Sequence, residues 1–189
     1  MVRWKTLGKV AIFVDYANIL HSYQDLGWRI DFLKLKELVE NKGAKLTDCF
    51  FFDAVDRVRS NQVRFQQKLQ SFGYQLSIKP LRFFFDPKTK TYSKKGDCDA
   101  DLAVDAIRFR KRYETMFLFS GDGDYVKLVR YLRKDCKKKV VVFSQRDHVA
   151  RILIEAANFF IPLDKLKEEI EFKEKSPQNH KRLPKEPLG

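Results

Sequence analysis

The chain has 189 residues, which is enough for one domain with a substantial core. Its composition, 44% hydrophobic and 14% aromatic with 17 phenylalanines, excludes a disordered chain. The formal net charge is +13, of which residues 172–189 contribute only +3 through five basic and two acidic side chains. The charge of residues 1–171 favours a polyanionic partner, most simply nucleic acid, although a generally solvated basic surface would also explain it.

Three cysteines, Cys49, Cys98 and Cys136, are widely spaced and form no C-x-x-C motif. They therefore predict neither a disulfide framework nor a zinc site. The chain also has no signal-peptide pattern and no long apolar run. We therefore expect a soluble, cytoplasmic protein that has no membrane partner.

The predicted strands and helices alternate along the chain. Short apolar runs predict strands at residues 9–14, 45–53, 74–79, 116–119, 139–143 and 159–162. Apolar residues at helical spacing predict helices at 30–41, 57–72, 126–132, 147–157 and 163–172, with two more after Asp15 and around residues 101–112. This alternation predicts an α/β fold with a mostly parallel sheet and helices on both faces.

The folded domain is expected to span residues 9–171. Residues 1–8 form a basic N-terminal extension. Residues 172–189 contain three prolines and many charges, so we expect this tail to be disordered.

Two predicted strands end directly in aspartates. Asp15 follows the first strand, with Asn18 three residues later, and Asp122 and Asp124 alternate with glycines after the fourth strand. The carboxyl ends of parallel strands meet at one edge of a sheet, and ligands bind at that edge in open α/β folds. Helix capping would explain Asp15 alone, but it would not explain the second strand end.

A third acidic group lies at residues 97–105, where Asp97, Asp99, Asp101 and Asp105 fall around the start of a predicted helix. The helix dipole favours aspartates in a first turn, and this explains part of the group. Four carboxylates in nine residues of a basic protein are more than the start of a helix requires. We therefore expect some of them to join the acidic edge of the sheet.

Residues 81–95 interleave basic and aromatic side chains around an Asp-Pro turn signal. We expect a β-hairpin or a flexible flap in which Arg82, Lys94 and Lys95 contact phosphates while aromatic rings stack on unpaired bases. Arg57, on the outward face of its predicted helix, is a further candidate for a nucleic-acid contact. The alternative is that the phenylalanines of this segment pack in the core and its lysines are solvated.

Several carboxylates on a basic protein can hold one or two Mg²⁺ or Mn²⁺ ions, because these ions prefer oxygen ligands. Such ions orient water as a nucleophile and stabilise charge on a phosphoryl group, which is the chemistry of a metal-dependent nuclease. Asp53 and Asp56 are outer candidates after another strand, although solvation in a loop is the simpler interpretation of both. The sequence holds only three histidines and no Walker A or G-x-G-x-x-G pattern.

Three motifs, taken in order, resemble those of the NYN domain family, in its LabA-like branch within the PIN-like nuclease superfamily. They are VAIFVDYAN at residues 10–18, KGDCD at 95–99 followed by LAVD at 102–105, and SGDGDY at 120–125. Each motif is weak alone, whereas the ordered triplet is specific. The resemblance covers about residues 9–165. It implies a PIN-like three-layer α/β/α sandwich, Mg²⁺ or Mn²⁺ as cofactor and RNA as partner.

The resemblance also implies roles for the residues at the matching positions. It makes four aspartates catalytic residues and metal ligands, directly or through water: Asp15, Asp99, Asp122 and Asp124. Asn18 and Ser120 would support them, and Asp105 would be a further acidic member of the site. Asp97 falls at a variable position, and Tyr125 stands where the family often has phenylalanine.

These observations lead to one principal hypothesis and two alternatives. We expect a ribonuclease that cleaves RNA phosphodiester bonds with a divalent metal. A non-catalytic RNA- or protein-binding module with the same fold would share the basic surface. A phosphatase or phosphotransferase would also use acidic strand ends, but the sequence lacks an evident nucleophile motif for it. PIN-like domains often pair, so a homodimer is an oligomeric state that the resemblance implies.

Overall fold

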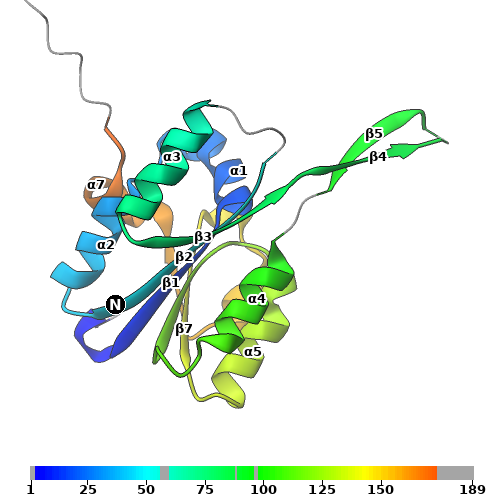
Figure 1. Cartoon of the computed structure of the whole chain (residues 1–189). Coiled ribbons are helices and arrows are strands. Elements are labelled where there is room, and N and C mark those ends of the chain that lie inside the picture. The colour runs from blue at the N-terminus through cyan, green and yellow to red at the C-terminus, as the bar shows by residue number, and fades with distance from the viewer. Residues whose placement is uncertain (1–2, 56–59, 88, 96–97, 174–189) are drawn as a thin grey trace, which may run out of the picture.

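The computed structural model describes residues 3–55, 60–87, 89–95 and 98–173, and its centre is a six-stranded parallel sheet (Figure 1). The strand order is β3-β2-β1-β6-β7-β8, and every neighbouring pair is parallel. The strands are β1 (Lys9–Asp15), β2 (Lys45–Val55), β3 (Tyr74–Pro80), β6 (Thr115–Phe119), β7 (Lys139–Ser144) and β8 (Phe159–Pro162). The six strands predicted from apolar runs are therefore all present.

Helices cover both faces of this sheet. One face carries α1 (Tyr16–Leu26), α2 (Phe32–Asn41), α3 (Ser60–Ser71) and α7 (Lys167–Ile170), and the other carries α4 (Asp99–Arg108), α5 (Val126–Lys134) and α6 (Arg151–Ala156). Figure 1 shows α4 and α5 on the side of the sheet opposite α1 and α2. The three-layer α/β/α sandwich is confirmed. None of the helices in the described ranges has both the length and the apolar character needed to cross a membrane.

The central strand β1 is buried on both faces, as its continuous apolar run predicts. Val10, Ile12 and Val14 face the core beneath α1 and α2, and Ala11 and Phe13 face the core beneath α4 and α5. All five side chains are completely buried. A strand packed on both faces and paired on both edges has little freedom to move, so its last residue is held firmly at the carboxyl edge of the sheet.

The strand order reverses at β1, which pairs with β2 on one side and with β6 on the other. The chain builds one half of the sheet from β1, β2 and β3 and the other half from β6, β7 and β8. The helices that follow β1 and β6 lie on opposite faces, so the loops after these two strands diverge. Ligands in open α/β sheets bind at such a reversal point, and the aspartates of the first and third motifs lie there.

β4 (Arg82–Asp86) and β5 (Thr91–Lys95) form an antiparallel hairpin that projects from the body of the molecule (Figure 1). This confirms the hairpin interpretation of the basic, aromatic segment. Phe85 in β4 is 53% exposed, so this ring is not part of the core. The side chains of Arg82, Lys94 and Lys95, and the whole of Arg57, lie outside the described part of the chain. Their contacts with RNA stay predictions.

The helix predicted at residues 147–157 begins later than expected. Residues Arg146–His148 form a separate 3-10 turn, η3, and α6 starts only at Arg151. The reason is a long-range hydrogen bond: Ala150 is extended, and its N–H donates to the carbonyl of Gly121 at 2.8 Å. Helical geometry at this point would remove that bond, so the contact with the loop after β6 determines where α6 begins.

The two ends of the described chain also differ from expectation in detail. The helix predicted at residues 163–172 is a 3-10 turn, η4 (Leu163–Leu166), followed by the single turn of α7. Near the N-terminus, η1 (Trp4–Thr6) places the indole ring of Trp4 edge-on against Phe117, with 5.3 Å between ring centroids. Part of the predicted N-terminal extension therefore packs against the core.

Candidate metal centre

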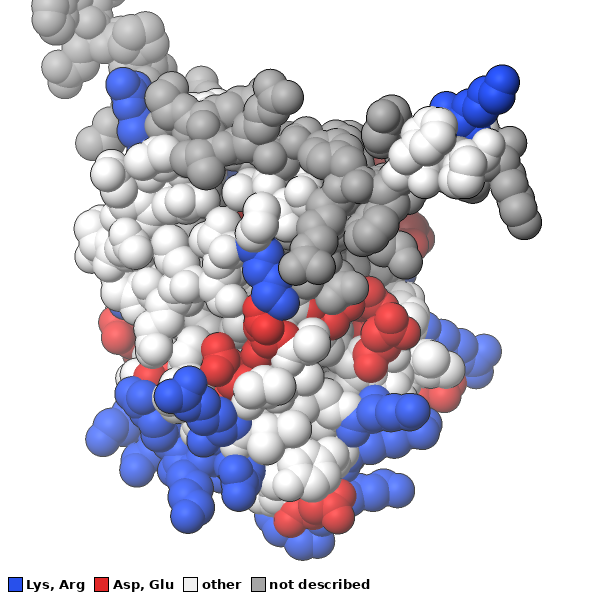
Figure 2. Space-filling model, turned by 45° about the vertical axis from the view of Figure 1, so that its right-hand side comes forward, with Lys and Arg blue, Asp and Glu red and all other residues white. Residues whose placement is uncertain are grey.

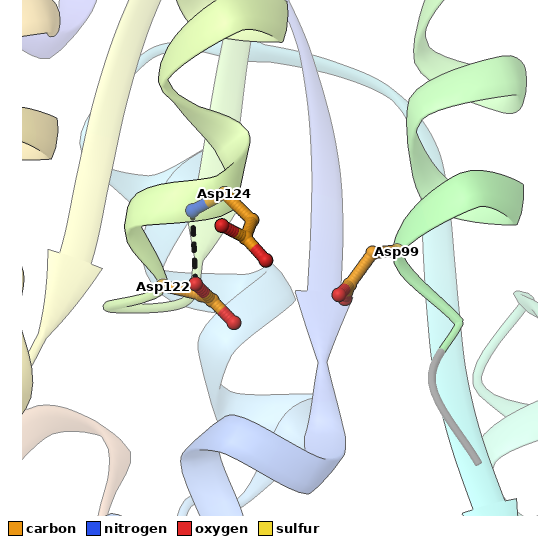
Figure 3. A group of neighbouring side chains, drawn as sticks. All are labelled: Asp99, Asp122 and Asp124. Carbon is orange, nitrogen blue, oxygen red and sulfur yellow. Dashed lines mark hydrogen bonds between the residues drawn. The ribbon is translucent and has the colours of Figure 1, made fainter. Parts of the chain in front are cut away.

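Three aspartates from distant parts of the sequence face one another at the carboxyl end of β1 (Figure 3). Asp99 is the first residue of α4, Asp122 follows β6, and Asp124 lies in η2 (Gly123–Tyr125). One carboxylate oxygen from each residue lies within 4.8 Å of the other two. Oxygens bound to one Mg²⁺ are about 3–4 Å apart, so small side-chain movements would close this group on an ion. A donor set made only of carboxylate oxygens fits Mg²⁺ or Mn²⁺.

Asp15 lies beside these three residues at the end of β1 and is only 7% exposed. Its carboxylate accepts a hydrogen bond from the N–H of Asn18 at 3.2 Å and another from the hydroxyl of Ser120 at 2.9 Å. The first bond caps α1. The second ties the end of β1 to the end of β6, so the same side chain caps a helix and joins the two strands at the reversal point.

The hydroxyl of Tyr125 connects two of the carboxylates. It donates a 2.6 Å hydrogen bond to Asp99 and lies 3.4 Å from a carboxylate oxygen of Asp15. Burial, followed by the negative charge of Asp15, raises the pKa of Tyr125 far above its usual value of 10, so the hydroxyl remains a donor. The sequence shows this tyrosine only as a mild departure from the family pattern, because the contact depends on where α4 packs.

Ser120 and Asn18 hold the loop that carries Asp122. The hydroxyl of Ser120 is fully buried and accepts a hydrogen bond from the N–H of Asp122 at 3.1 Å. The side-chain carbonyl of Asn18 accepts a hydrogen bond from the N–H of Gly121 at 2.8 Å. The carboxylate of Asp122 in turn accepts the N–H of Asp124 at 2.9 Å, as Figure 3 shows. Both Ser120 and Asn18 thus contact the loop directly, as a supporting role requires.

The acidic group is electrostatically strained without a cation. The pKa of Asp15 is raised from its ordinary 3.8 to about 6, mainly by burial and to a lesser extent by the charges of Asp99 and Asp122. The hydrogen bonds from Asn18 and Ser120 act in the opposite direction and do not cancel the effect. A positive charge within a few ångströms favours the ionised form of a carboxylate, so a divalent cation would relieve this strain.

Asp53 belongs to the same cleft, and its interpretation as a solvated loop residue is wrong. β2 continues to Val55, so Asp53 is a strand residue, and burial together with the charge of Asp15 raises its pKa to about 6. The cleft has a volume of about 180 Å³. Its polar lining residues are Asp15, Asn18, His21, Asp53, Cys98, Asp99 and Asp122. Asp56, the second outer candidate, lies outside the described residues.

Two other aspartates of α4, Asp101 and Asp105, are separate from this group. Asp101 forms an ion pair with Lys79 of β3 at 2.7 Å. Asp105 lies six residues beyond Asp99, which is roughly 9 Å along the axis of α4. Asp97 lies outside the described residues. Of the acidic residues named by the resemblance, the fold brings four together and leaves Asp105 apart: the four are Asp15, Asp99, Asp122 and Asp124.

Gly121 is required because another segment passes very close to it. A Cβ atom at this position would collide with the backbone carbonyl of His148 and would lie 2.7 Å from the hydroxyl of Ser144. Its φ angle is not in the left-handed region, so the close approach explains the glycine. Gly123 is less constrained, since its added Cβ would lie 3.2 Å from the side chain of Ala150.

Much of the positive charge lies at the opposite edge of the sheet. Residues 108–112 and 133–139 lead into β6 and β7, and their nine cations form what we call the basic edge: Arg108, Arg110, Lys111, Arg112, Arg133, Lys134, Lys137, Lys138 and Lys139. A five-residue strand separates the two edges by roughly 17 Å. In Figure 2, acidic side chains gather near the middle of the visible face and most basic side chains lie below them. Within the described part of the chain, the acidic centre and the basic edge therefore lie at opposite ends of the strands.

Comparison with known proteins agrees with this geometry. The family model of the NYN domain matches residues 9–164. The chain belongs to the NYN domain family. This NYN protein is 27% identical over 165 residues to the low amplitude and bright protein LabA of Synechococcus elongatus, covering 86% of this chain and 88% of that one. The LabA-like assignment made from the three ordered motifs is confirmed.

The NYN fold also matches a solved structure. The crystal structure of a protein of unknown function from Vibrio parahaemolyticus RIMD 2210633 superposes with a TM-score of 0.73 at 24% sequence identity. The match covers 87% of this chain and 96% of the Vibrio chain. At this identity the likeness concerns the fold alone, and it supports the α/β/α arrangement.

Proposed function

We propose that this NYN protein is a ribonuclease that uses Mg²⁺ or Mn²⁺ to cleave RNA phosphodiester bonds. The observation that carries the proposal is the convergence of Asp99, Asp122 and Asp124, whose oxygens lie within 4.8 Å of one another. Membership of a family in the PIN-like nuclease superfamily supports the same chemistry and supports RNA as the substrate.

Each residue of the acidic centre has a distinct part in this proposal. Asp99, Asp122 and Asp124 would hold the ion, which when bound would activate a water molecule and neutralise charge on the phosphoryl oxygens. The hydroxyl of Tyr125 fixes the orientation of Asp99. Asp15 and Asp53 contribute further negative charge from the floor of the cleft, which strengthens the attraction for a divalent cation.

The test is cleavage of a labelled RNA in Mn²⁺ by the unaltered protein, by Asp122→Asn and by Asp99→Asn. Loss of one ligand should lower the rate roughly 100-fold or more, since even groups that only orient metal ligands are worth 10- to 100-fold. Asp164→Asn is the matched control, because it removes an equal charge at an exposed position in η4. It should cleave at the rate of the unaltered protein.

Two outcomes would contradict the nuclease proposal. Equal cleavage by all four proteins would identify the activity as a contaminant. Salt-sensitive RNA binding that survives EDTA and yields no product would favour the alternative, a non-catalytic RNA-binding module.

A further inference from the structure

A second and larger cavity lies beside the acidic cleft. It has a volume of about 650 Å³ and is bounded by α1, α3 and the end of the described chain. We call it the aromatic pocket after six of its lining residues: Tyr16, Tyr23, Phe32, Phe65, Phe72 and Phe172. Its size falls within the range of roughly 300–1,000 Å³ that is usual for small-molecule sites.

The aromatic pocket adjoins the acidic cleft. Asp53 and Ala54 line both cavities. Tyr16, which lines the aromatic pocket, directly follows Asp15 at the end of β1. A molecule that reaches from one cavity into the other would therefore place its apolar part within one residue of the carboxylates.

The wall of the pocket is apolar, but its rim is not. Asn61 and Gln66 on α3 present side-chain amides, and Gln66 makes no side-chain hydrogen bond within the described part of the chain. Arg29 and Lys68 add two exposed cations. The ammonium group of Lys68 lies 5.6 Å from the ring centroid of Phe172, so cation and ring share one side of the pocket.

We propose that the aromatic pocket binds a nucleobase of the RNA whose adjacent phosphodiester lies at the aspartates. This inference rests on the proposed function and adds a subsite to it. A nucleobase is flat, stacks on aromatic rings and presents donors and acceptors at its edge, which match the pocket wall and the two amides. The cations at the rim meet the phosphates of the same strand. An apolar peptide would fill the wall but would leave the side-chain amide of Gln66 and the cations of the rim without a polar partner.

The experiment measures binding separately from cleavage. Ribonucleoside 5′-monophosphates are titrated in EDTA and followed by saturation-transfer NMR, with ribose 5-phosphate as the probe that lacks a base. We expect saturation of the base protons and no comparable binding of ribose 5-phosphate. Binding that depends on phosphate alone, with equal affinity for ribose 5-phosphate, would overturn the proposal.

Two variants and a control locate the base. Leu20 lines the pocket from α1 and is 49% exposed, so Leu20→Trp fills the space without disturbing the core and should weaken binding at least about tenfold. Gln66→Ala removes one amide and should weaken it about three- to tenfold. Gln67→Ala, on the exposed neighbour outside the pocket, should stay within about twofold. Unchanged affinity in both pocket variants would refute the assignment.

The same variants separate this inference from the nuclease proposal. If nucleotides bind as expected and no RNA is cleaved in Mn²⁺, the base site stands and the nuclease proposal fails. If RNA is cleaved and both pocket variants match the unaltered protein in rate and in preferred cleavage site, the nuclease proposal stands and the base site fails.

Discussion

The hydroxyl of Tyr125 donates a 2.6 Å hydrogen bond to the carboxylate of Asp99. Tyr125 belongs to the turn after β6, whereas Asp99 begins α4, so this bond joins the two halves of the acidic centre across the end of β1. The same oxygen is 3.4 Å from Asp15. It therefore lies between two carboxylates that would otherwise repel each other directly.

Removal of this hydroxyl should destabilise the protein when no metal is present. Tyr125→Phe leaves Asp99 and Asp15 without a shared donor, and a hydrogen bond to a charged group contributes about 1.5–3 kcal/mol. Urea unfolding in EDTA should show a loss of this order. Tyr131→Phe is the control, because the Tyr131 hydroxyl contacts a thiol, that of Cys136, at a 39% exposed position, and its removal should cost markedly less. Equal losses in the two variants would show that the bond has no special effect.

The stability of the metal-free protein should fall as the pH rises from about 4 to above 6. Burial raises the pKa of Asp15 from 3.8 to about 6, so the folded state holds a proton that the unfolded state releases in this range. A shift of this size corresponds to about 2–3 kcal/mol. The side chain at position 15 of the Asp15→Asn variant does not titrate. The free energy of unfolding of this variant, relative to that of the unaltered protein, should therefore rise by this amount between pH 4 and pH 7.5.

This pH dependence is measured by urea unfolding of both proteins in EDTA at a series of pH values. The difference between their free energies of unfolding cancels the titration of carboxylates far from position 15, whereas Asp53, Asp99 and Asp122 interact with Asp15 and contribute to the difference. Addition of Mn²⁺ at pH 7.5 should restore stability to the unaltered protein. Parallel pH profiles for the two proteins would contradict the assignment of the raised pKa to Asp15.

An alanine at position 121 should affect both folding and the acidic centre. The new Cβ atom of Gly121→Ala collides with the backbone of His148, so one of the two loops must move. Overpacking of this kind costs about 1–3 kcal/mol, and the movement would also displace Asp122. Gly123→Ala meets only side chains, that of Ala150 at 3.2 Å and that of Ile152 at 3.4 Å, and should cost less. Thermal unfolding and RNA cleavage of the two variants provide the comparison, and a larger effect at position 123 would contradict it.

Two pairs of lysines test where RNA lies on the surface. If a short oligonucleotide binds at the acidic edge and the hairpin, Lys94→Ala with Lys95→Ala should weaken binding and reduce the salt slope by about 1–2. Lys134→Ala with Lys137→Ala removes the same charge from the basic edge, roughly 17 Å away, and should leave the affinity for that oligonucleotide almost unchanged. Filter binding at several salt concentrations measures both. The reverse order of effects would place the RNA on the basic edge.

The fold could be predicted from the sequence because its central strands are buried on both faces. The apolar runs that end at Asp15 and before Ser120 are typical of strands covered by helices on both sides, and parallel strands bring their ends to one edge. The start of α6 could not be predicted in this way. It depends on the bond from Ala150 to Gly121, and such a contact between distant residues leaves no periodic signal.

The sequence predicted those residues of the candidate site that lie at the ends of strands or within the three ordered motifs. Asp53 is an outer candidate in the sequence, but its burial is not predictable, because a carboxylate at the end of an apolar run looks the same whether the strand stops there or continues past it. The role of the Tyr125 hydroxyl escaped because it depends on the packing of α4, which the sequence does not locate. Both residues are polar groups whose burial is decided by neighbours far away in the chain.

The separation of the acidic centre from the basic edge contributes an electric dipole moment along the strands, in addition to the net charge of +13. The electric field of a polyanion such as RNA orients the protein before the two molecules make contact, so that the basic edge faces the RNA. The aspartates then face away from the approaching chain. First contact at the basic edge would then not be productive, and a cation bound at the cleft would favour the turn that brings the aspartates to the RNA.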